Sequence, residues 1–253
     1  MAIALTQLVK TLDQWLEPGQ VKDYCPNGLQ VEGRPQVRRI VSGVTASQAL
    51  LDAAVLAKAD AVLVHHGYFW RGEDPCVRGM KRRRLQTLLE HDISLIAYHL
   101  PLDIHPQLGN NAQLARRLGL TIEGGLELNS RQPVGLWGRL EQPLSATQLA
   151  ERLETELGRR PQWIEGRAEQ IETLGWCTGA AQGYIEHAIA RGLDGFISGE
   201  ISEPTVYAAR EGGVHYFGAG HHATERYGVQ ALGQQLADQF DIEHCYIELD
   251  NPV

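Results

Sequence analysis

The chain has 253 residues, which at about 150 residues per domain favours one large domain or two small ones. It is 43% hydrophobic and 21% charged, so disordered, collagen-like and disulfide-scaffold proteins are disfavoured as classes. The formal net charge of -8 disfavours nucleic acid and anionic lipid as partners, and no apolar stretch approaches the roughly 20 residues of a membrane span.

The cysteines indicate a reducing compartment, so we expect a cytoplasmic protein. They stand far apart and form no CxxC pair, which argues against both a thiolate zinc site and a secreted disulfide scaffold. The four are Cys25, Cys76, Cys177 and Cys245.

The first 16 residues, MAIALTQLVKTLDQWL, place apolar side chains at helical spacing without the apolar core of a signal peptide, which predicts an amphipathic helix. After it, short runs rich in Val, Ile and Tyr alternate with longer helical patterns. In the first half we expect strands near 39–45, 60–65 and 93–99, and helices at 47–58, 80–91 and 109–118. In the second half we expect strands near 133–140, 171–178, 194–198, 214–217 and 244–249, and helices at 145–157, 181–191, 203–211 and 222–239.

This alternation predicts an α/β fold with mostly parallel strands, and the two halves resemble each other. VSGVTASQALLDAAVLAKADAVLVHHG aligns with WCTGAAQGYIEHAIARGLDGFISGE if one residue slips, which places Asp60 on Asp194. The next unit places Asp103 opposite His221. The alternative is that any two βα units share small residues and an Asp at strand starts. We expect two related α/β domains, 1–128 and 129–253, with the split near residues 125–130.

Three groups of polar residues follow predicted strands, where α/β units place ligands. The first is His65-His66-Gly67 after DAVLV. Successive strand residues point to opposite faces, so the pair could serve two neighbouring ions, or one ion if the chain turns. Taken alone, adjacent histidines are more often structural.

The second group is the HLPLDIH segment from His99 to His105. Pro101 favours an extended or turning path, which would aim the Asp103 carboxylate into the space at the strand ends. The alternative role of Asp103 is to cap a helix that begins near Leu108.

The third group is GAGHHATE, in which a glycine-rich turn leads into a helix. His221 and Glu225 are four residues apart, so they lie on one helical face within reach of one ion. A His and a Glu at this interval also occur by chance, but the two preceding glycines suggest close backbone approach to a ligand.

Together the groups supply three imidazoles and two carboxylates from both halves, a set suited to Zn, Fe, Mn, Co or Ni rather than Ca. The set is too rich for one closed structural ion, so we expect two divalent metal ions per subunit. If Asp103 and Glu225 each bridge both ions, open positions remain for water and substrate.

These motifs, with the loop YCPNGLQ at 24–30 and GNNAQLA after AYHLPLD, resemble the Nif-three-like dinuclear-metal proteins of the bacterial YbgI type, labelled GTP cyclohydrolase 1 type 2 homologues. The resemblance covers essentially the whole chain. It implies two related, interlinked α/β domains in a toroidal homohexamer with inward-facing metal sites. It also implies two bridging carboxylates and the metal ligands His65, His66, Asp103, His221 and Glu225. Many relatives have proline where this chain has Gly67.

The leading hypothesis for function is a metal-dependent hydrolase that acts on a small anionic, phosphorylated or nucleotide-like substrate. His99, at the end of the strand before Asp103, is the candidate proton shuttle; its alternative role is to support a metal ligand. The competing hypothesis is a non-catalytic, metal-stabilised ring scaffold that binds another macromolecule. No Walker-type loop or GxGxxG fingerprint occurs, so any nucleotide would be recognised by metal and pocket side chains.

Two further features have ordinary interpretations. The basic run Lys81-Arg82-Arg83-Arg84 could meet phosphate or nucleic acid, but we expect it to be the solvated start of a helix whose apolar face is Leu85, Leu88 and Leu89. Asn27-Gly28 could bind a ligand, but is more typical of a tight turn.

Overall fold

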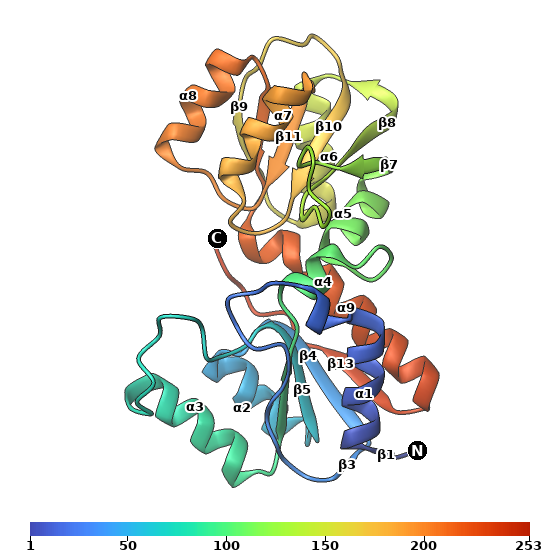
Figure 1. The fold of residues 1–253 in the computed structure, drawn as a ribbon, viewed down its shortest axis with the longest axis vertical. Coiled ribbons are helices and arrows are strands. Elements are labelled where there is room, and N and C mark those ends of the chain that lie inside the picture. The colour runs from blue at the N-terminus through green and yellow to red at the C-terminus, as the bar shows by residue number, and fades with distance from the viewer. The chain divides into compact units, whose positions relative to one another are not determined.

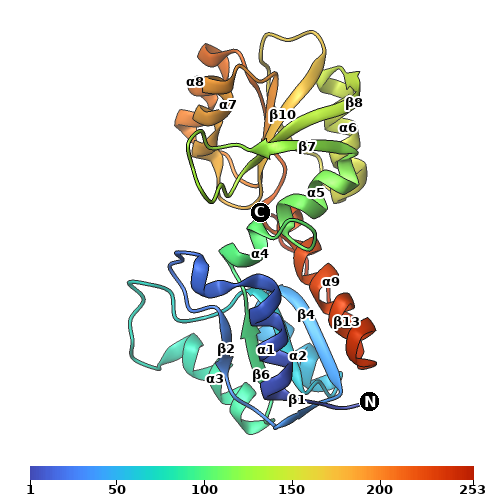
Figure 2. The same ribbon diagram turned by 45° about the vertical axis from the view of Figure 1, so that its right-hand side comes forward.

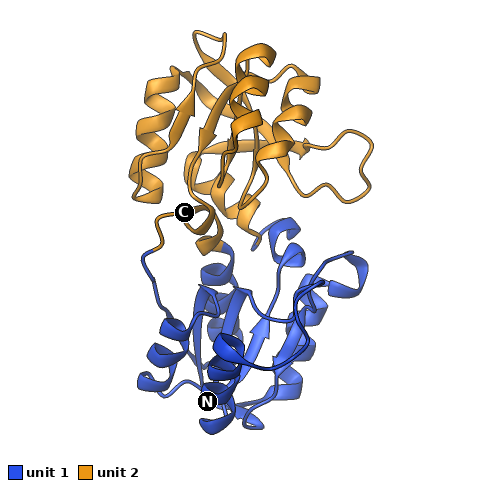
Figure 3. Ribbon diagram, turned by 90° about the vertical axis from the view of Figure 1, so that its left-hand side faces the viewer, with its two compact units in different colours: residues 1–108, 228–250 blue, residues 109–227, 251–253 orange.

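The computed structural model describes all residues, 1–253, and divides them into two compact units (Figures 1 and 3). Unit 1 is Met1–Leu108 with Gly228–Asp250, and unit 2 is Gly109–Tyr227 with Asn251–Val253. The sequence-based division into 1–128 and 129–253 differs from these bounds in two places. Residues 109–128 pack within unit 2, and most of the last 26 residues pack within unit 1.

The helix α9 explains the second difference, because it begins in unit 2 and ends in unit 1. Tyr227, in its first half, packs in a core of unit 2, whereas Leu232 and Leu236, five and nine residues later, pack in a core of unit 1. None of the helices has the combination of length and apolar character that a membrane span requires.

Unit 1 contains a five-stranded sheet in the order β13-β4-β5-β6-β2, a small sheet β1-β3, and helices on both faces of the larger sheet. The strands β13, β4, β5 and β6 are parallel, and β2 is antiparallel to β6. The strands are β1 Ile3–Ala4, β2 Gly28–Val31, β3 Gln36–Val37, β4 Arg39–Thr45, β5 Ala61–His66, β6 Ser94–Ala97 and β13 Glu243–Tyr246. The helices are α1 Leu5–Leu16, η1 Pro18–Gln20, α2 Gln48–Leu56, α3 Gly79–Glu90 and α4 Leu100–Ile104, with the last part of α9 His221–Phe240.

Side chains that alternate along the central strands build two separate cores in unit 1. Leu63 of β5 faces α1 and the C-terminal part of α9, whereas its neighbours Val62 and Val64 face α2 and α3. Figures 1 and 2 show α1 on one face of the sheet and α2 with α3 on the other. His65 follows in the same alternation as Leu63, and both side chains are buried.

Unit 2 contains a six-stranded sheet in the order β7-β8-β10-β11-β12-β9. The strands β10, β11 and β12 are parallel, and the other three strand pairings of this sheet are antiparallel. The predicted α/β class is confirmed. The prediction of mostly parallel strands holds for the large sheet of unit 1 but not for the sheet of unit 2. The strands are β7 Leu120–Gly125, β8 Leu136–Leu144, β9 Gln162–Ile164, β10 Ile171–Cys177, β11 Gly195–Ser198 and β12 His215–Gly218. The helices are α5 Asn110–Leu118, α6 Ala146–Leu157, η2 Gln182–Tyr184, α7 Ile185–Arg191 and α8 Glu203–Gly212, with the start of α9. In Figure 2, α7 and α8 lie on one side of this sheet and α5 and α6 on the other.

The two units repeat one arrangement, as the internal sequence similarity predicts. In each, three parallel strands, β4-β5-β6 or β10-β11-β12, are followed at the edge by one antiparallel strand. Asp60 accepts hydrogen bonds from two successive backbone N–H groups at the start of β4. Asp194 likewise accepts hydrogen bonds from two successive backbone N–H groups at the start of β10. This shared role supports a duplication.

Candidate metal centre

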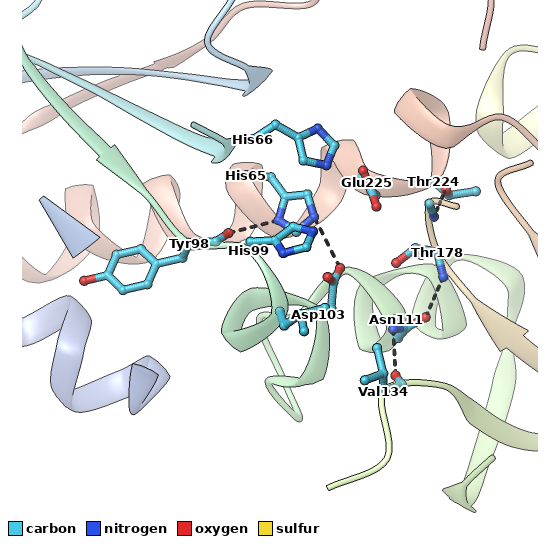
Figure 4. Close-up of polar contacts among 12 residues, drawn as sticks. His65, His66, Tyr98, His99, Asp103, Asn111, Val134, Thr178, Thr224 and Glu225 are labelled. Atoms are coloured by element: carbon cyan, nitrogen blue, oxygen red, sulfur yellow. Dashed lines mark hydrogen bonds and ion pairs between the residues drawn. The ribbon is translucent and has the colours of Figure 1, made fainter. Parts of the chain in front are cut away.

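His65 ends the central strand of unit 1 and is fully buried. Its Nδ1 lies 2.9 Å from the carbonyl oxygen of Tyr98, and its Nε2 lies 3.5 Å from Oδ1 of Asp103 (Figure 4). A carbonyl oxygen only accepts hydrogen bonds, so Nδ1 carries a proton and donates it, and in the neutral ring the lone pair is on Nε2. His65 therefore presents a metal-ligating atom toward the Asp103 carboxylate.

His66 and His99 stand beside His65 in the same unit. The His65 and His66 rings are 4.6 Å apart and those of His65 and His99 are 5.0 Å apart, although His65 and His66 are neighbours on a strand. Nδ1 of His66 is hydrogen-bonded to Thr45 Oγ1 at 3.1 Å. One ring nitrogen of each of the three histidines lies within 4.8 Å of the others, a spacing that could hold a metal ion.

Asp103 lies in the short helix α4, where the sequence predicts an extended or turning path. Pro101 does not prevent this helix, because it occupies the first turn, where a backbone N–H has no helical partner to lose. The N–H groups of Leu102 and Asp103 donate to the carbonyl of His99, and α4 ends before Asn110, where α5 begins. Asp103 therefore does not cap α5, and its side chain is buried against His65.

Sequence reasoning did not single out Asp23, which organises the loop before β2. Its Oδ1 accepts a hydrogen bond from His99 Nδ1 at 2.9 Å, and its Oδ2 accepts from Asn27 and from the backbone of Leu100. Burial would raise the pKa of Asp23, but the hydrogen bonds from His99 and Asn27, with the nearby imidazole charge, lower it to about 2. Asn27 also binds the backbone N–H of His99, so the Asn27-Gly28 segment holds His99 in place rather than forming an isolated turn.

Cys25 also lies near Asp23 and His99, and one ligand atom of each residue lies within 4.8 Å of the others. Burial and the negative charges of Asp23 and Asp103 raise the pKa of Cys25 to about 12. In the absence of a nearby cation, the thiol of Cys25 is therefore protonated at neutral pH. All four cysteines are free thiols.

In unit 2, His221 is the first residue of α9 and lies between two carboxylates. Its Nδ1 is 2.7 Å from Glu200 Oε1, and its Nε2 is 3.0 Å from Glu225 Oε2. Burial would lower the pKa of His221, but the hydrogen bonds and charges of Glu225 and Glu200 raise it to about 9. The metal-free imidazole therefore holds a proton on Nε2 at neutral pH, at the position where a cation would bind.

Gly179 packs against the side chains of His221 and Glu225. It follows β10 with a φ of +70°, and a Cβ there would lie 2.0 Å from Glu225 Oε1 and 3.2 Å from His221 Nε2. Its N–H donates to Thr224 Oγ1, and Thr178 before it donates to Asn111 Oδ1 (Figure 4). Only glycine leaves room for the carboxylate and imidazole in this arrangement.

Each unit therefore carries an imidazole Nε2 next to a buried carboxylate: His65 with Asp103, and His221 with Glu225. In both, the other ring nitrogen is fixed by an acceptor, the arrangement that orients metal-ligating histidines. Imidazole and carboxylate donors without thiolate fit first-row divalent ions such as Zn, Fe, Mn, Co or Ni.

A model of the DUF34/NIF3 family (NGG1p interacting factor 3) matches residues 3–252. The chain belongs to the DUF34/NIF3 family. It is 60% identical to a GTP cyclohydrolase 1 type 2 homolog of Pseudomonas aeruginosa over 100% of both chains, and 58% identical to one of Vibrio cholerae over 98% of both.

Solved structures of the family agree with the fold. The protein ybgI, of unknown function, is 50% identical, with a TM-score of 0.96 over 99% of this chain and 100% of the other. TTHA1606 from Thermus thermophilus is 31% identical, with a TM-score of 0.89 and the same coverage. The resemblance to the Nif-three-like proteins and the two-unit α/β fold that it implies are thus confirmed.

The sequence patterns did not identify four residues that position the candidate site residues or the loops around them. These are Glu200, Gly179, Asn111 and Asp23. Asn111 lies in the GNNAQLA motif, and its side chain holds the loop before Gly179 while its amide nitrogen donates to the carbonyl of Val134. Glu200 is the second residue after β11, as Gly179 is after the neighbouring parallel strand β10, so its position after a strand was an available signal.

Proposed function

We propose that this member of the DUF34/NIF3 family is a metal-dependent hydrolase with two divalent ions per subunit. His65, His66 and Asp103 of unit 1 and His221 and Glu225 of unit 2 would hold the pair, with the two carboxylates as bridges. The observation that carries the proposal is the imidazole–carboxylate pair in each unit, with Nε2 next to a buried carboxylate oxygen. Divalent ions held there would polarise the substrate and lower the pKa of water.

His99 is the residue that we assign to proton transfer. Its Nδ1 is hydrogen-bonded to Asp23, which fixes the orientation of the ring and leaves Nε2 to exchange a proton. In catalytic triads, a buried carboxylate likewise accepts a hydrogen bond from Nδ1 of the catalytic histidine and orients its ring. His99 would take a proton at Nε2 during attack and return it to the leaving group.

The substrate that this arrangement favours is small and anionic, either phosphorylated or nucleotide-like. Two ions of total charge about +4, less two bridging carboxylates, leave about +2, which attracts an anion to a protein whose net charge is -8. The name of the relatives, GTP cyclohydrolase 1 type 2 homolog, fits a nucleotide-like substrate. We also propose a cytoplasmic protein and a ring-shaped homohexamer, as the family resemblance implies; light scattering of the purified protein would test the hexamer.

A substrate screen tests the enzymatic proposal. Phosphoesters, amides and purine nucleotides are offered to wild type purified without chelator, to the same protein after metal removal, and to the variants Glu225→Gln and His99→Asn. Turnover should disappear after metal removal and return when metal is restored. It should fall at least 100-fold in both variants, with metal retained in His99→Asn.

Three results would contradict the proposal in different ways. Equal hydrolysis in Glu225→Gln would place the activity outside this centre. Loss of metal from His99→Asn would make His99 a ligand rather than a proton shuttle. Metal-dependent thermal stability without turnover of any substrate class would favour the scaffold, because ions that bind only the folded state stabilise it without chemistry.

A further inference from the structure

Unit 2 contains a pocket that the metal ligands do not use. It has a volume of about 450 Å³, within the range of about 300–1,000 Å³ that small-molecule sites occupy. One wall is formed by residues 180–186, which continue directly from Gly179. The other wall begins at Ser202, two residues after Glu200.

The loops that carry these walls also hold His221. The N–H of Gly199 donates to the carbonyl of Gly179 at 2.9 Å, and this contact joins the loop after β10 to the loop after β11. A Cβ on Gly199 would lie 2.6 Å from the Cα of His221, so both loops pack directly against the start of α9. One wall of the pocket therefore continues directly from Gly179, which contacts the second imidazole–carboxylate pair within the same unit.

The lining of the pocket favours an uncharged ligand. Its wall is mainly small and apolar, with Ala180, Ala181 and Ala208, and with the ring of Tyr184. Glu186 is the only lining residue that is charged at neutral pH, and no Lys, Arg or His lines the pocket. A phosphate group would find no cation here and would be repelled by this carboxylate, whereas an apolar ring would bury surface.

One polar group in the lining lacks a partner within the protein. Oε1 of Gln182 is buried and accepts no hydrogen bond, which is unfavourable for a buried polar group. The hydroxyls of Ser202 and Thr205 already bind each other at 2.9 Å at the start of α8. A ligand with an N–H donor at the edge of an apolar ring would satisfy the amide and fill the pocket.

We propose that this pocket binds the uncharged planar nitrogen heterocycle of the substrate, of the nucleobase class, with Gln182 accepting a hydrogen bond from it. The inference rests on the proposed function, in which the anionic part of the substrate goes to the metal ligands. It assigns the two ends of the substrate to different side chains: the charged end to the His221 side, and the ring to the pocket.

Gly183 offers a variant that fills the pocket without strain. It lines the pocket, its φ lies outside the left-handed region, and a Cβ there would meet no atom within 4 Å. Gly19 is a matched control, because it is also the central residue of a three-residue 3-10 helix with open space at its Cβ, but it lies in unit 1. Gly183→Val should thus block the pocket, and Gly19→Val should not.

The experiment titrates adenosine, inosine and cytidine into metal-replete wild type, Gly183→Val, Gly19→Val and Gln182→Leu, by calorimetry. At least one nucleoside should bind wild type and Gly19→Val alike, with a Kd below about 1 mM. Its Kd should rise at least tenfold in Gly183→Val and rise also in Gln182→Leu. Ribose 5-phosphate, which lacks the heterocycle, should give the same titration with Gly183→Val as with wild type.

The inference is overturned if no nucleoside binds wild type, if Gly183→Val binds it as tightly as wild type does, or if ribose 5-phosphate also responds to Gly183→Val. Repeating the titration with chelator separates this inference from the proposed function. Nucleoside binding that persists without metal and is still lost in Gly183→Val supports the pocket even if the protein hydrolyses nothing.

Discussion

Position 179 requires glycine for two reasons: its backbone has a positive φ, and the neighbouring side chains leave no room for a Cβ. Its φ of +70° costs about 1 kcal/mol or more for a residue with a Cβ, and that Cβ would also displace the Glu225 carboxylate. Gly192 has a φ of +68° but open space around a Cβ. A substitution at Gly192 therefore causes backbone strain alone, whereas the same substitution at Gly179 causes backbone strain and also displaces a proposed metal ligand.

We expect Gly179→Ala and Gly192→Ala each to lower the free energy of unfolding by about 1 kcal/mol or more. Only Gly179→Ala should weaken metal binding, by at least tenfold, because only there does the new methyl group meet Glu225 and His221. Thermal melts and metal titrations of the two variants check this. Equal metal affinity in both would show that Glu225 tolerates the displacement or is not a ligand.

The carboxyl of Asp23 links the N-terminal loop to His99, and its side chain is 3% exposed. Its pKa falls from 3.8 to about 2 on folding, so its contribution to stability is fully present above pH 3.8 and is lost as the pH falls through about 2. Asp23→Asn should lower the free energy of unfolding at pH 7 by about 1–2 kcal/mol, after allowance for solvent screening. Denaturant titrations should show this difference shrink below pH 3; a constant difference down to pH 2 would contradict it.

At the residue scale, the sequence predicted the metal-ligand candidates because they follow strands or share a helix face. The residues that orient them could not be found in this way. Asp23 and His99 are 76 positions apart, and the Asn111 side chain meets Thr178 across 67, so their hydrogen bonds exist only once the sheets have formed. The assignment of His65, His66, Asp103, His221 and Glu225 as ligands stays a prediction.

At the scale of elements, helices and strands with a strong apolar pattern were predictable, and edge strands without one, such as β7 and β9, were not. The strand β5 and the helix α6 lie within one residue of their expected bounds, because each has a strong apolar pattern and α6 begins with a capping box at Ser145. The strand β7 was missed because its central residues, Thr121, Ile122 and Glu123, are exposed. The strand β9 has only three residues, too few for an alternating pattern.

The predicted apolar face of the helix α3 is confirmed only in part. Leu88 is buried and Leu85 is partly buried, but Leu89 is 61% exposed, so the apolar face is narrower than predicted. Within the basic run, Lys81 lies over the ring of Phe69 and pairs with Glu73. The guanidinium of Arg84 lies over the ring of Tyr68.

Arg82 and Arg83 are both exposed, so we expect the double change to Gln to alter stability by less than about 0.5 kcal/mol and to leave metal content unchanged. Circular dichroism melts, elemental analysis and light scattering check this. If the double variant changes its oligomeric state or loses a measurable affinity for nucleic acid, the run is an interface, and the scaffold hypothesis gains support.

At the scale of the whole molecule, the proposed ligands come from segments that are far apart in the sequence and belong to both units. Metal binding should therefore stabilise the folded chain as a whole. At a free metal concentration of 100 times Kd, the gain is about 2.7 kcal/mol, which for a chain of this size raises Tm by about 5–10 °C. Calorimetric melts with metal and with chelator check this; identical melting temperatures would show that the folded state binds no metal.

The proposal of two bridged metal ions is tested by the metal content per chain of wild type, Asp103→Asn and Glu225→Gln, all purified without chelator. Wild type should carry two divalent ions. Each variant should lose both together, because each carboxylate is proposed to bridge the pair, whereas His66→Gln should empty mainly one position. Two ions per chain in both Asp103→Asn and Glu225→Gln, or none in wild type after metal is supplied, would contradict the account.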